Sequence, residues 1–518
     1  MMIRWNKKLK GLRCYIYLLG WLGLLLVALS YWRAEHTSLR ASHAPSRRGD
    51  DESRGKWTSD DNAYGPDKPR LKKLRQLCNP AERIHAASEG RLANTAYDLM
   101  GMIVAIRHGD RGPLMSVRNL SHINCSHRSY MSGAYKNFVS AVMNASRSSD
   151  FASFAGSFSK YPVLPSLYHC SAAHLTPVGV VQHLKLGKVL KEIYINNLNL
   201  FSHPWEIDDV VIHSTKFRRT YQSALAFLHG FLPKFDVSQL RVVEGRSVSF
   251  CNNNCRCDRL ALLDEKYDQE RKMFRNSHPG VMDLLERLSA IVKEGPGAPD
   301  ITHPGAMRDA LLVYACHGHA LPCVGGVCVQ AEDVSSIISY EEWERRQKKS
   351  KAKHKASKLR AYGLLKDIAQ TMDTMMRDGK PKFVLYSGHD KTLNYLLDSL
   401  SLPAYQLPNY ASRIIFEVYK NSSFKSTSEM YRNSFYFRII YNGKDITKFL
   451  PFCSVKIISH YTSANNVLNA VNLCPITSFD NFLRASNYFA VFNATNFKSA
   501  CTLEKTSGAL RQIANTGQ

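Results

Sequence analysis

The sequence lacks an internal repeat, which excludes architectures built from stacked copies of one unit. It also lacks the paired Cys-x-x-Cys spacing that is typical of structural zinc sites. Acidic residues are scarce, since 43 Asp and Glu stand against 69 Lys and Arg, and none precedes position 14. About 440 residues follow the first 77, which is enough for one large domain with sizeable insertions.

The amino-terminal segment has the features of a membrane anchor. Residues 1–13 carry five basic side chains, and residues 14–32 form an uncharged run that spans about 28 Å as a helix, roughly one bilayer core. Because positive flanks stay in the cytosol, we expect a single-pass type II signal-anchor with all later residues in the lumen. The alternative is a signal peptide cleaved near Ser30, but the apolar run exceeds the usual roughly 7–15 residues.

The rest of the chain fits a lumenal location. Residues 33–77 are polar and mixed in charge without a helical or strand period, which predicts a flexible stem before a domain at 78–518. Five Asn-x-Ser/Thr sequons agree with the secretory pathway and are the expected glycosylation sites. They begin at Asn119, Asn124, Asn144, Asn421 and Asn493.

The cysteines allow two interpretations. The chain has 13, and apart from Cys14 in the apolar run they form an even number, which favours disulfides in an oxidising lumen. A zinc cluster is the alternative, drawn from Cys251, Cys255, Cys257, Cys316, His317, His319 and Cys323. Because their spacing matches no standard zinc motif, we favour disulfides and expect no metal.

The most informative stretch is Arg107–Pro113, which reads Arg-His-Gly-Asp-Arg-Gly-Pro. It follows the apolar run Met102–Ile106, whose length and β-branching are typical of a buried strand. Charged groups at the carboxyl end of such a strand lie where open α/β sheets bind ligands. Two guanidinium groups can bind phosphoryl oxygens, and the imidazole between them can attack phosphorus. A basic surface loop is the simpler interpretation, but five constrained positions in seven argue against it.

Two further segments repeat the strand–turn–helix pattern. Lys382–Tyr386 reads as a strand, and Ser-Gly-His-Asp at 387–390 leads into an apolar helical pattern through Leu400. Asp390 can be an ordinary helix cap, which is compatible with a catalytic role. Asp209–Ile212 reads as a third strand, followed by His-Ser-Thr-Lys-Phe-Arg-Arg-Thr at 213–220.

The order of these elements predicts an α/β fold with a mainly parallel sheet flanked by helices. Strands are expected near 102–106, 209–213 and 382–387, with further strands at 413–419 and 435–441. Helices are expected between and after them, at 176–194, 219–232 and 390–400.

Together the three motifs resemble the histidine acid phosphatases, a branch of the histidine phosphatase superfamily. The resemblance implies hydrolysis through a phosphohistidine, with His108 as nucleophile and Asp390 as proton donor. It implies that no cofactor or metal takes part and that phosphate is bound by Arg107, Arg111, Arg219 and His389. It also implies a largely helical cap built from insertions near 114–170 and 245–375.

The third motif departs from the family pattern of Arg-Ser-Thr followed, three residues later, by Arg-Thr. His213 replaces the first arginine, and Lys216 stands where an acidic residue is common. Alignment on Ser-Thr makes Arg219 the phosphate-binding residue, although the adjacent Arg218 stays an alternative. In the first motif, Asp110 is expected to orient neighbouring donors.

Longer segments resemble one subfamily, the Golgi phosphatases that remove the 2-phosphate from xylose in the glycosaminoglycan–protein linkage region of proteoglycans. They are Leu175–Leu184, Gly230–Pro233, Arg413–Glu417 and Tyr441–Gly443, and the similarity runs from 78 to 501. This implies a Golgi membrane protein with a lumenal catalytic domain and a phosphorylated linkage glycan as its partner. The alternatives are a broad acid phosphatase, an inositol-phosphate phosphatase and a non-catalytic glycan-binding scaffold.

Residues 345–355 form the densest basic run of a chain with a net charge of +26. Nucleic acid is not expected as a partner, because the predicted compartment excludes it. A solvated helix face is one interpretation of the run. The other is long-range attraction of polyanionic glycosaminoglycan chains to a basic surface.

Overall fold

The computed structural model describes the chain from Gln76 to Leu503, with short gaps. The gaps are residues 93–95, 127–131, 167–169, 252–255, 347–349, 403–406, 424–427, 454–457 and 465–466. The expected cytosolic tail and signal-anchor, and the stem as far as residue 75, lie outside the described residues. Within the described ranges, no helix is long and apolar enough to cross a membrane.

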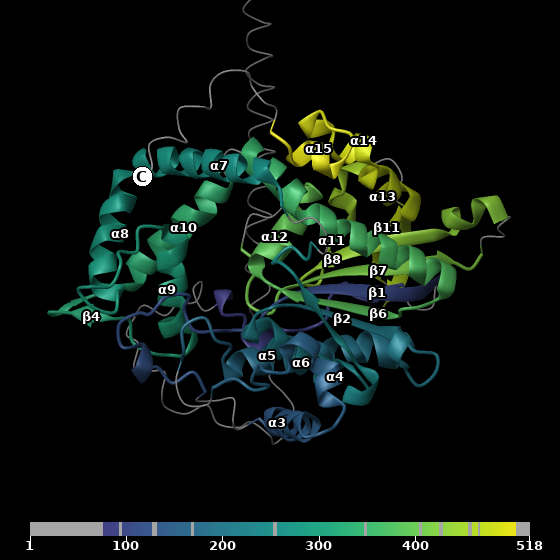
Figure 1. The fold of residues 1–518 in the computed structure, drawn as a ribbon, viewed down its shortest axis with the longest axis horizontal. Coiled ribbons are helices and arrows are strands. Elements are labelled where there is room, and N and C mark those ends of the chain that lie inside the picture. The colour runs from purple at the N-terminus through teal and green to yellow at the C-terminus, as the bar shows by residue number, and fades with distance from the viewer. Residues whose placement is uncertain are drawn as a thin grey trace, which may run out of the picture. The chain divides into compact units, whose positions relative to one another are not determined.

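The centre of the domain is a mixed sheet with the strand order β10-β11-β8-β7-β1-β6-β2-β3, in which β9 pairs with β8 (Figure 1). The parallel half consists of β1 (Tyr97–Arg107), β6 (Phe383–Gly388), β2 (Val210–Thr215) and β3 (Val242–Gly245). The antiparallel half consists of β7 (Arg413–Asn421), β8 (Phe435–Tyr441), β9 (Lys444–Asp445), β10 (Ile458–Ala464) and β11 (Val467–Pro475). The predicted α/β class is confirmed, and β7 and β8 are the two further strands that were expected.

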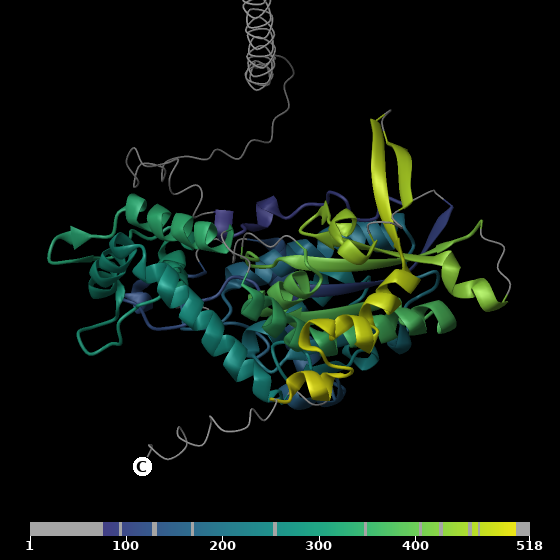
Figure 2. The same cartoon turned by 90° about the horizontal axis from the view of Figure 1, so that it is seen from above.

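The sheet is mostly buried, and β1 shows why its sequence is apolar without alternation. Met102, Val104 and Ile106 enter the hydrophobic core on one face of the sheet. Ile103 and Ala105 enter the core on the other face. Because successive side chains of a strand point to opposite faces, a strand covered on both sides needs an apolar residue at every position. The β10–β11 hairpin differs, since only the end of β11 pairs with β8 and the rest projects from the sheet (Figure 2).

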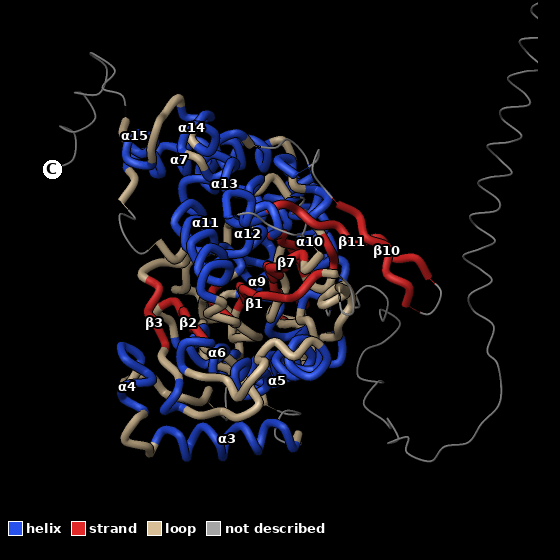
Figure 3. Tube along the Cα trace, turned by 90° about the vertical axis from the view of Figure 1, so that its right-hand side faces the viewer, coloured by secondary structure: helices blue, strands red, loops and turns tan. Residues whose placement is uncertain are grey.

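Helices cover both faces of the sheet (Figures 1 and 3). One face carries α5 (Pro177–Lys191) and α6 (Arg218–Phe231), with α3 (Gly133–Ser146) and α4 (Phe151–Ala155) outside them. The other carries α11 (Lys351–Asp378), α12 (Asp390–Ser399), α13 (Ile476–Leu483), α14 (Ala485–Tyr488) and α15 (Phe497–Cys501).

Local chemistry fixes where these helices begin and end. Thr176 caps α5 by accepting a hydrogen bond from the Gly179 amide (3.2 Å), and Pro177 occupies the first turn, where no amide hydrogen is needed. Helix α11 ends at Asp378 and is capped by Gly379, whose φ of 70° is left-handed and favours glycine.

The cap is smaller than the two insertions expected from sequence. It consists of α7 (Asp258–Asn276), α8 (Pro279–Val292), α9 (Pro304–Cys316), α10 (Ala331–Arg346) and the hairpin β4–β5 (Cys323–Val324 and Val327–Cys328). Helix α11, which begins within the second insertion, packs on the sheet instead, because its apolar side chains belong to a sheet core. The insertion at 114–170 adds α3 and α4 outside α5 and α6, since Tyr135, Phe138 and Phe154 fill the core there.

Disulfides join distant parts of the domain. They link Cys78 to Cys316, Cys125 to Cys170, Cys257 to Cys501, Cys323 to Cys328 and Cys453 to Cys474, and Cys251 is also disulfide-bonded. The preference for disulfides is confirmed, because the described cysteines of the alternative zinc cluster are all oxidised. Two of the bonds attach the cap, at the start of α7 and the end of α9.

Candidate active site

The three sequence motifs meet at the carboxyl edge of the parallel strands. Arg107 at the end of β1 stands in register with Gly388 at the end of β6, and Ser387 stands in register with Ser214 of β2. The His108 amide donates a hydrogen bond to the Gly388 carbonyl (3.0 Å), which ties the first motif to the second. Because parallel strands end at one edge, side chains far apart in sequence are gathered there.

Gly109 allows the first motif to approach α5 closely. A Cβ atom at this position would lie 2.4 Å from the Gly179 carbonyl oxygen and 2.6 Å from its Cα. Both contacts are with backbone, which cannot move aside as a flexible side chain would. The glycine of Arg-His-Gly is therefore required by packing against the first turn of α5.

His108 is buried, and its hydrogen bonding fixes the tautomer. Its Nδ1 lies 2.8 Å from the Gly109 carbonyl oxygen, which can only accept, so Nδ1 carries the hydrogen and Nε2 keeps its lone pair. Burial lowers the pKa of His108 well below its usual value, and the neighbouring guanidinium groups of Arg219, Arg107 and Arg111 lower it further. The imidazole is therefore neutral at physiological pH, with a nucleophilic nitrogen available.

Three arginines surround this imidazole. Arg107 donates from Nη1 to the Pro408 carbonyl (2.6 Å), and its guanidinium lies 4.3 Å from the ring centre of Tyr410. Arg111 forms two hydrogen bonds with the Asp309 carboxylate, at 2.8 and 3.3 Å. The buried Nε–H of each of the three arginines finds no acceptor among the described residues.

Arg219 is the third arginine, and the structure separates it from its neighbour. Its Nη2 lies 3.5 Å from Nδ1 of His389, whereas Arg218 is exposed. Burial and the charge of Arg111 lower the pKa of Arg219 to about 10. Guanidinium groups crowded closely enough to lower one another's pKa indicate a site for an anion.

The second motif places His389 and Asp390 at the start of α12. Nε2 of His389 lies 2.9 Å from the Thr215 hydroxyl, so the third motif positions this ring. Burial and Arg219 lower the pKa of His389 to about 3. The rings of His108 and His389 meet edge to face, with centroids 5.6 Å apart.

Asp390 is ionised in this arrangement. Burial favours its neutral form, but the charges of Arg107 and Arg111 outweigh that effect and lower the pKa of Asp390 to about 2. Its Oδ2 lies 3.7 Å from Nη2 of Arg107, and its Oδ1 accepts a hydrogen bond from the Lys391 amide (2.7 Å). The side chain is 30% exposed, so solvent reaches the carboxylate.

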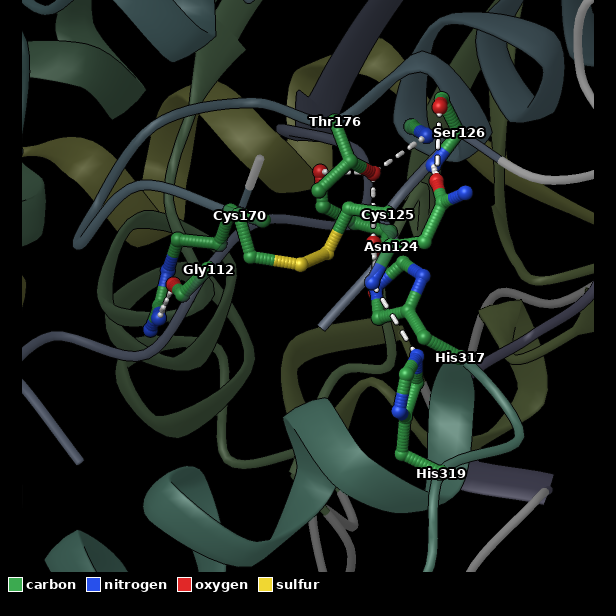
Figure 4. The surroundings of a disulfide bond; sticks show 11 residues. Gly112, Asn124, Cys125, Ser126, Cys170, Thr176, His317 and His319 are labelled. Carbon is green, nitrogen blue, oxygen red and sulfur yellow. Dashed lines mark hydrogen bonds and ion pairs between the residues drawn. A yellow bond between two sulfur atoms is a disulfide. The ribbon is translucent and has the colours of Figure 1, made fainter. Parts of the chain in front are cut away.

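Asp110 points away from the arginines and holds the loop. Its carboxylate accepts a hydrogen bond from the Thr176 hydroxyl (2.5 Å), and Nε2 of His317 lies 2.9 Å from the same oxygen. Figure 4 shows Thr176 and His317 beside the disulfide between Cys125 and Cys170. This network joins the first motif to α5 and to the end of α9.

Sequence reasoning missed Asp309 and Tyr410. Asp309 lies on α9 in the cap, and besides holding Arg111 it accepts a hydrogen bond from the Leu114 amide (2.8 Å). Tyr410 lies beneath Arg107, with its ring centroid 6.0 Å from that of His108, and burial raises its pKa to about 12. Neither residue belongs to a motif, because each is brought to the site by tertiary packing.

The sequon asparagines lie at the surface of the described domain. Asn119, Asn124, Asn144 and Asn493 are exposed, and Asn421 is half-buried at the end of β7. The asparagine side chains are therefore accessible to different degrees, and glycosylation of these positions stays a prediction.

Known proteins that are similar to this chain include two phosphatases. The chain is 30% identical to the 2-phosphoxylose phosphatase 1 of Danio rerio over 458 residues, which cover 83% of this chain and 87% of that protein. It is 29% identical to the 2-phosphoxylose phosphatase 1 of Homo sapiens over 435 residues, which cover 82% and 86%.

Among solved structures, the chain is similar to the apo form of Hafnia alvei phytase. The TM-score is 0.47 and the identity is 13%, with 80% of this chain and 100% of that one covered. A family profile described as histidine phosphatase superfamily (branch 2) matches residues 98–442, a range that contains all three motifs. The chain therefore belongs to branch 2 of the histidine phosphatase superfamily.

Proposed function

We propose that this phosphatase acts through a phosphohistidine formed on His108, and that it removes the 2-phosphate from xylose in the glycosaminoglycan–protein linkage region. The observation that carries the mechanism is the neutral His108 imidazole among three arginines, with Nε2 free to attack. A dianionic phosphoryl group would be attracted by the guanidinium groups and would accept hydrogen bonds from their unused Nε–H groups.

The reaction has two steps. Nε2 of His108 attacks phosphorus while the bond from phosphorus to the sugar oxygen breaks, and Asp390 gives a proton to that oxygen. Water then attacks the phosphohistidine, Asp390 takes a proton from it, and inorganic phosphate leaves. Arg107, Arg111, Arg219 and His389 hold the equatorial oxygens and stabilise the charge of the transition state.

The proton on Asp390 must arrive with the substrate. Since the pKa of Asp390 is lowered to about 2, the carboxyl is ionised before phosphate binds. A phosphate monoester loses its second proton near pH 6, so the monoanion present under mildly acidic conditions can supply this proton. A bound phosphate also neutralises Arg107 and Arg111, which raises the proton affinity of Asp390.

The substrate assignment is supported by the two relatives named 2-phosphoxylose phosphatase 1, which match most of the chain. A Golgi location with a lumenal catalytic domain is part of the same proposal. The disulfides and the exposed sequons support it, since both belong to the secretory pathway.

The experiment compares three substrates with the purified full-length chain. We expect turnover of p-nitrophenyl phosphate and of a phosphoxylosyl linkage oligosaccharide, both abolished in His108→Ala. A preference for inositol hexakisphosphate over the oligosaccharide would favour the inositol-phosphate alternative. Comparable rates on all three would favour a broad acid phosphatase, and no turnover at all would favour a glycan-binding scaffold.

A further inference from the structure

A second group of arginines lies in the cap, where α10 lies between α7 and α9 (Figure 1). His303 caps α9, with its Nδ1 accepting a hydrogen bond from the Gly305 amide (3.1 Å). Burial and the charges of four arginines together lower the pKa of His303 to about 4. The arginines are Arg271 and Arg275 of α7, Arg308 of α9 and Arg345 of α10.

Only half of this positive charge is neutralised. Arg271 pairs with Glu344 (3.0 Å), and Arg308 pairs with Glu341 (2.9 Å). Arg275 and Arg345 have no carboxylate within ion-pair distance in the described part of the chain, although each is only partly exposed. Arg275 lies one turn beyond Arg271 on α7, and Arg345 follows Glu344 on α10, so the Arg271–Glu344 ion pair brings these two unpaired arginines to the same corner of the cap. Unpaired, partly desolvated guanidinium groups favour the binding of an anion.

Aromatic side chains line the same corner of the cap. The ring of Trp343 meets that of His278 with centroids 4.5 Å apart, and it lies 5.8 Å from the rings of both Tyr340 and Phe274. Tyr340 is close enough to Arg275 and Arg271 for their charges to oppose the rise in its pKa that burial causes. Arginines next to an aromatic surface suit an acidic sugar, because the rings can pack on its apolar face while guanidinium groups bind its anion.

Arg308 connects this corner to the active site. Its charge acts on His303 and also lowers the pKa of Asp390. The next residue, Asp309, holds Arg111 beside the phosphate-binding groups. Through Arg308, which pairs with Glu341 of α10, and Asp309, which holds Arg111, helix α9 therefore links the cap arginines to the candidate phosphate site.

We propose that Arg271, Arg275, Arg345, His303 and Trp343 form a subsite for an acidic sugar, uronate or sulfated, in the same glycan that carries the phosphate. The inference rests on the proposed function and deepens it, because it assigns recognition of the glycan beyond the phosphorylated residue. The aromatic surface favours a saccharide over an inositol polyphosphate, which offers phosphates on every side.

The first test alters the protein. Arg275→Gln with Arg345→Gln removes both unpaired charges, and Lys272→Gln is the matched control because it removes an exposed charge from the same helix. On a uronate-bearing phosphoxylosyl oligosaccharide we expect the double variant to lose at least about tenfold in kcat/KM, mainly through KM. Activity on p-nitrophenyl phosphate and on a neutral phosphoxyloside should be retained, as it should in the control. Equal losses on all three substrates would overturn the subsite.

The second test alters the ligand and needs no variant. Reducing the uronate carboxyl to an alcohol should weaken binding of a non-phosphorylated linkage oligosaccharide to the wild-type chain, as measured by calorimetry. Equal affinity for the acidic and reduced sugars would overturn the proposal, and tighter binding of inositol hexasulfate than of the acidic sugar would do the same. This oligosaccharide carries no phosphate, so its binding tests the subsite separately from the proposed activity on phosphoxylose.

Discussion

Two histidines in this domain are each surrounded by arginines, and the two surroundings serve different ends. At the sheet edge, His108 lies among Arg107, Arg111 and Arg219, while in the cap His303 lies among four arginines. At the sheet edge the guanidinium groups are fixed by a backbone carbonyl, by Asp309 and by His389, and the buried Nε–H of each finds no acceptor among the described residues. In the cap two arginines are neutralised and two are not, so the charge is spread over a surface. The first arrangement suits chemistry at one atom, and the second suits recognition.

Removing the imidazole at the sheet edge should have the largest effect. We expect His108→Ala to lower turnover of p-nitrophenyl phosphate by roughly 10⁵-fold, because the proposed phosphoenzyme forms on this imidazole. The far-ultraviolet circular dichroism should stay unchanged. The control is His122→Ala, an exposed histidine outside the site. Retention of a tenth of the activity would disprove the nucleophile assignment.

The loss of rate on removing the proton donor should depend on the leaving group. Asp390→Asn should slow hydrolysis of a sugar phosphate by roughly 10²–10⁴-fold, and hydrolysis of an aryl phosphate by less, because phenolates need less protonation. In the wild type, kcat/KM should fall as the pH rises above about 6, where the substrate loses the proton that Asp390 must use. Rates measured on both substrates across pH check this. Equal losses on the two would indicate that Asp390 is only a helix cap.

A smaller effect is expected where the cap touches the site. Asp309→Asn keeps the shape of the side chain but removes the charge that fixes Arg111, so we expect the inhibition constant for inorganic phosphate to rise about 10- to 100-fold. Asp300→Asn is the matched control, since Asp300 is an exposed cap residue paired with Lys293. An unchanged inhibition constant in Asp309→Asn would show that Arg111 needs no partner to bind phosphate.

The two arginine groups also differ in how far the sequence predicts them. Arg107, His108, Arg111, His389 and Asp390 were predictable, because each follows a strand and parallel strands end at one edge. The different positions of Arg218 and Arg219 could not be predicted, since adjacent residues at a helix start point in different directions. Asp309 and the cap arginines follow no motif and meet only through packing of α7, α9 and α10.

The fold shows the same limit. The apolar runs of β1 and β6 predicted buried strands, because both faces of each are covered. The range of the cap was overestimated, since amphipathic helices that cover a sheet and helices that cap it have the same sequence period. The residues against which such a helix packs, such as the sheet residues in the core beside α11, lie far from the helix in the sequence, so the sequence pattern does not identify them.

The buried histidines should make the domain less stable in mild acid. His303 has a folded pKa of about 4, against roughly 6.5 in the unfolded chain. Below pH 6.5 the unfolded state binds the proton first, so stability is lost as the pH falls toward 4, by about 1–2 kcal/mol for this residue at pH 5. In His303→Gln the free energy of unfolding should change less between pH 7 and pH 5 than in the wild type. Denaturant unfolding at both values measures this, and an unchanged slope would show that His303 is not buried as a neutral ring.

The smallest effect is expected for the basic run at 345–355. Apart from Arg345, which belongs to the proposed cap subsite, several of its described members are occupied: Arg346 pairs with Glu342, Lys353 pairs with Asp398, and Lys355 lies over the ring of Phe492. Lys351 is exposed and has no such partner among the described residues, so Lys351→Gln tests what charge the run can still offer to a polyanion. If the run only solvates the start of α11, hydrolysis of a short phosphoxylosyl oligosaccharide and of a full sulfated chain should both stay unchanged. If the run attracts glycosaminoglycan, Lys351→Gln should slow hydrolysis of the long sulfated chain alone, and added salt should slow the wild type on that chain in the same way. Salt screens the charges that bring enzyme and substrate together and leaves the chemical step unchanged.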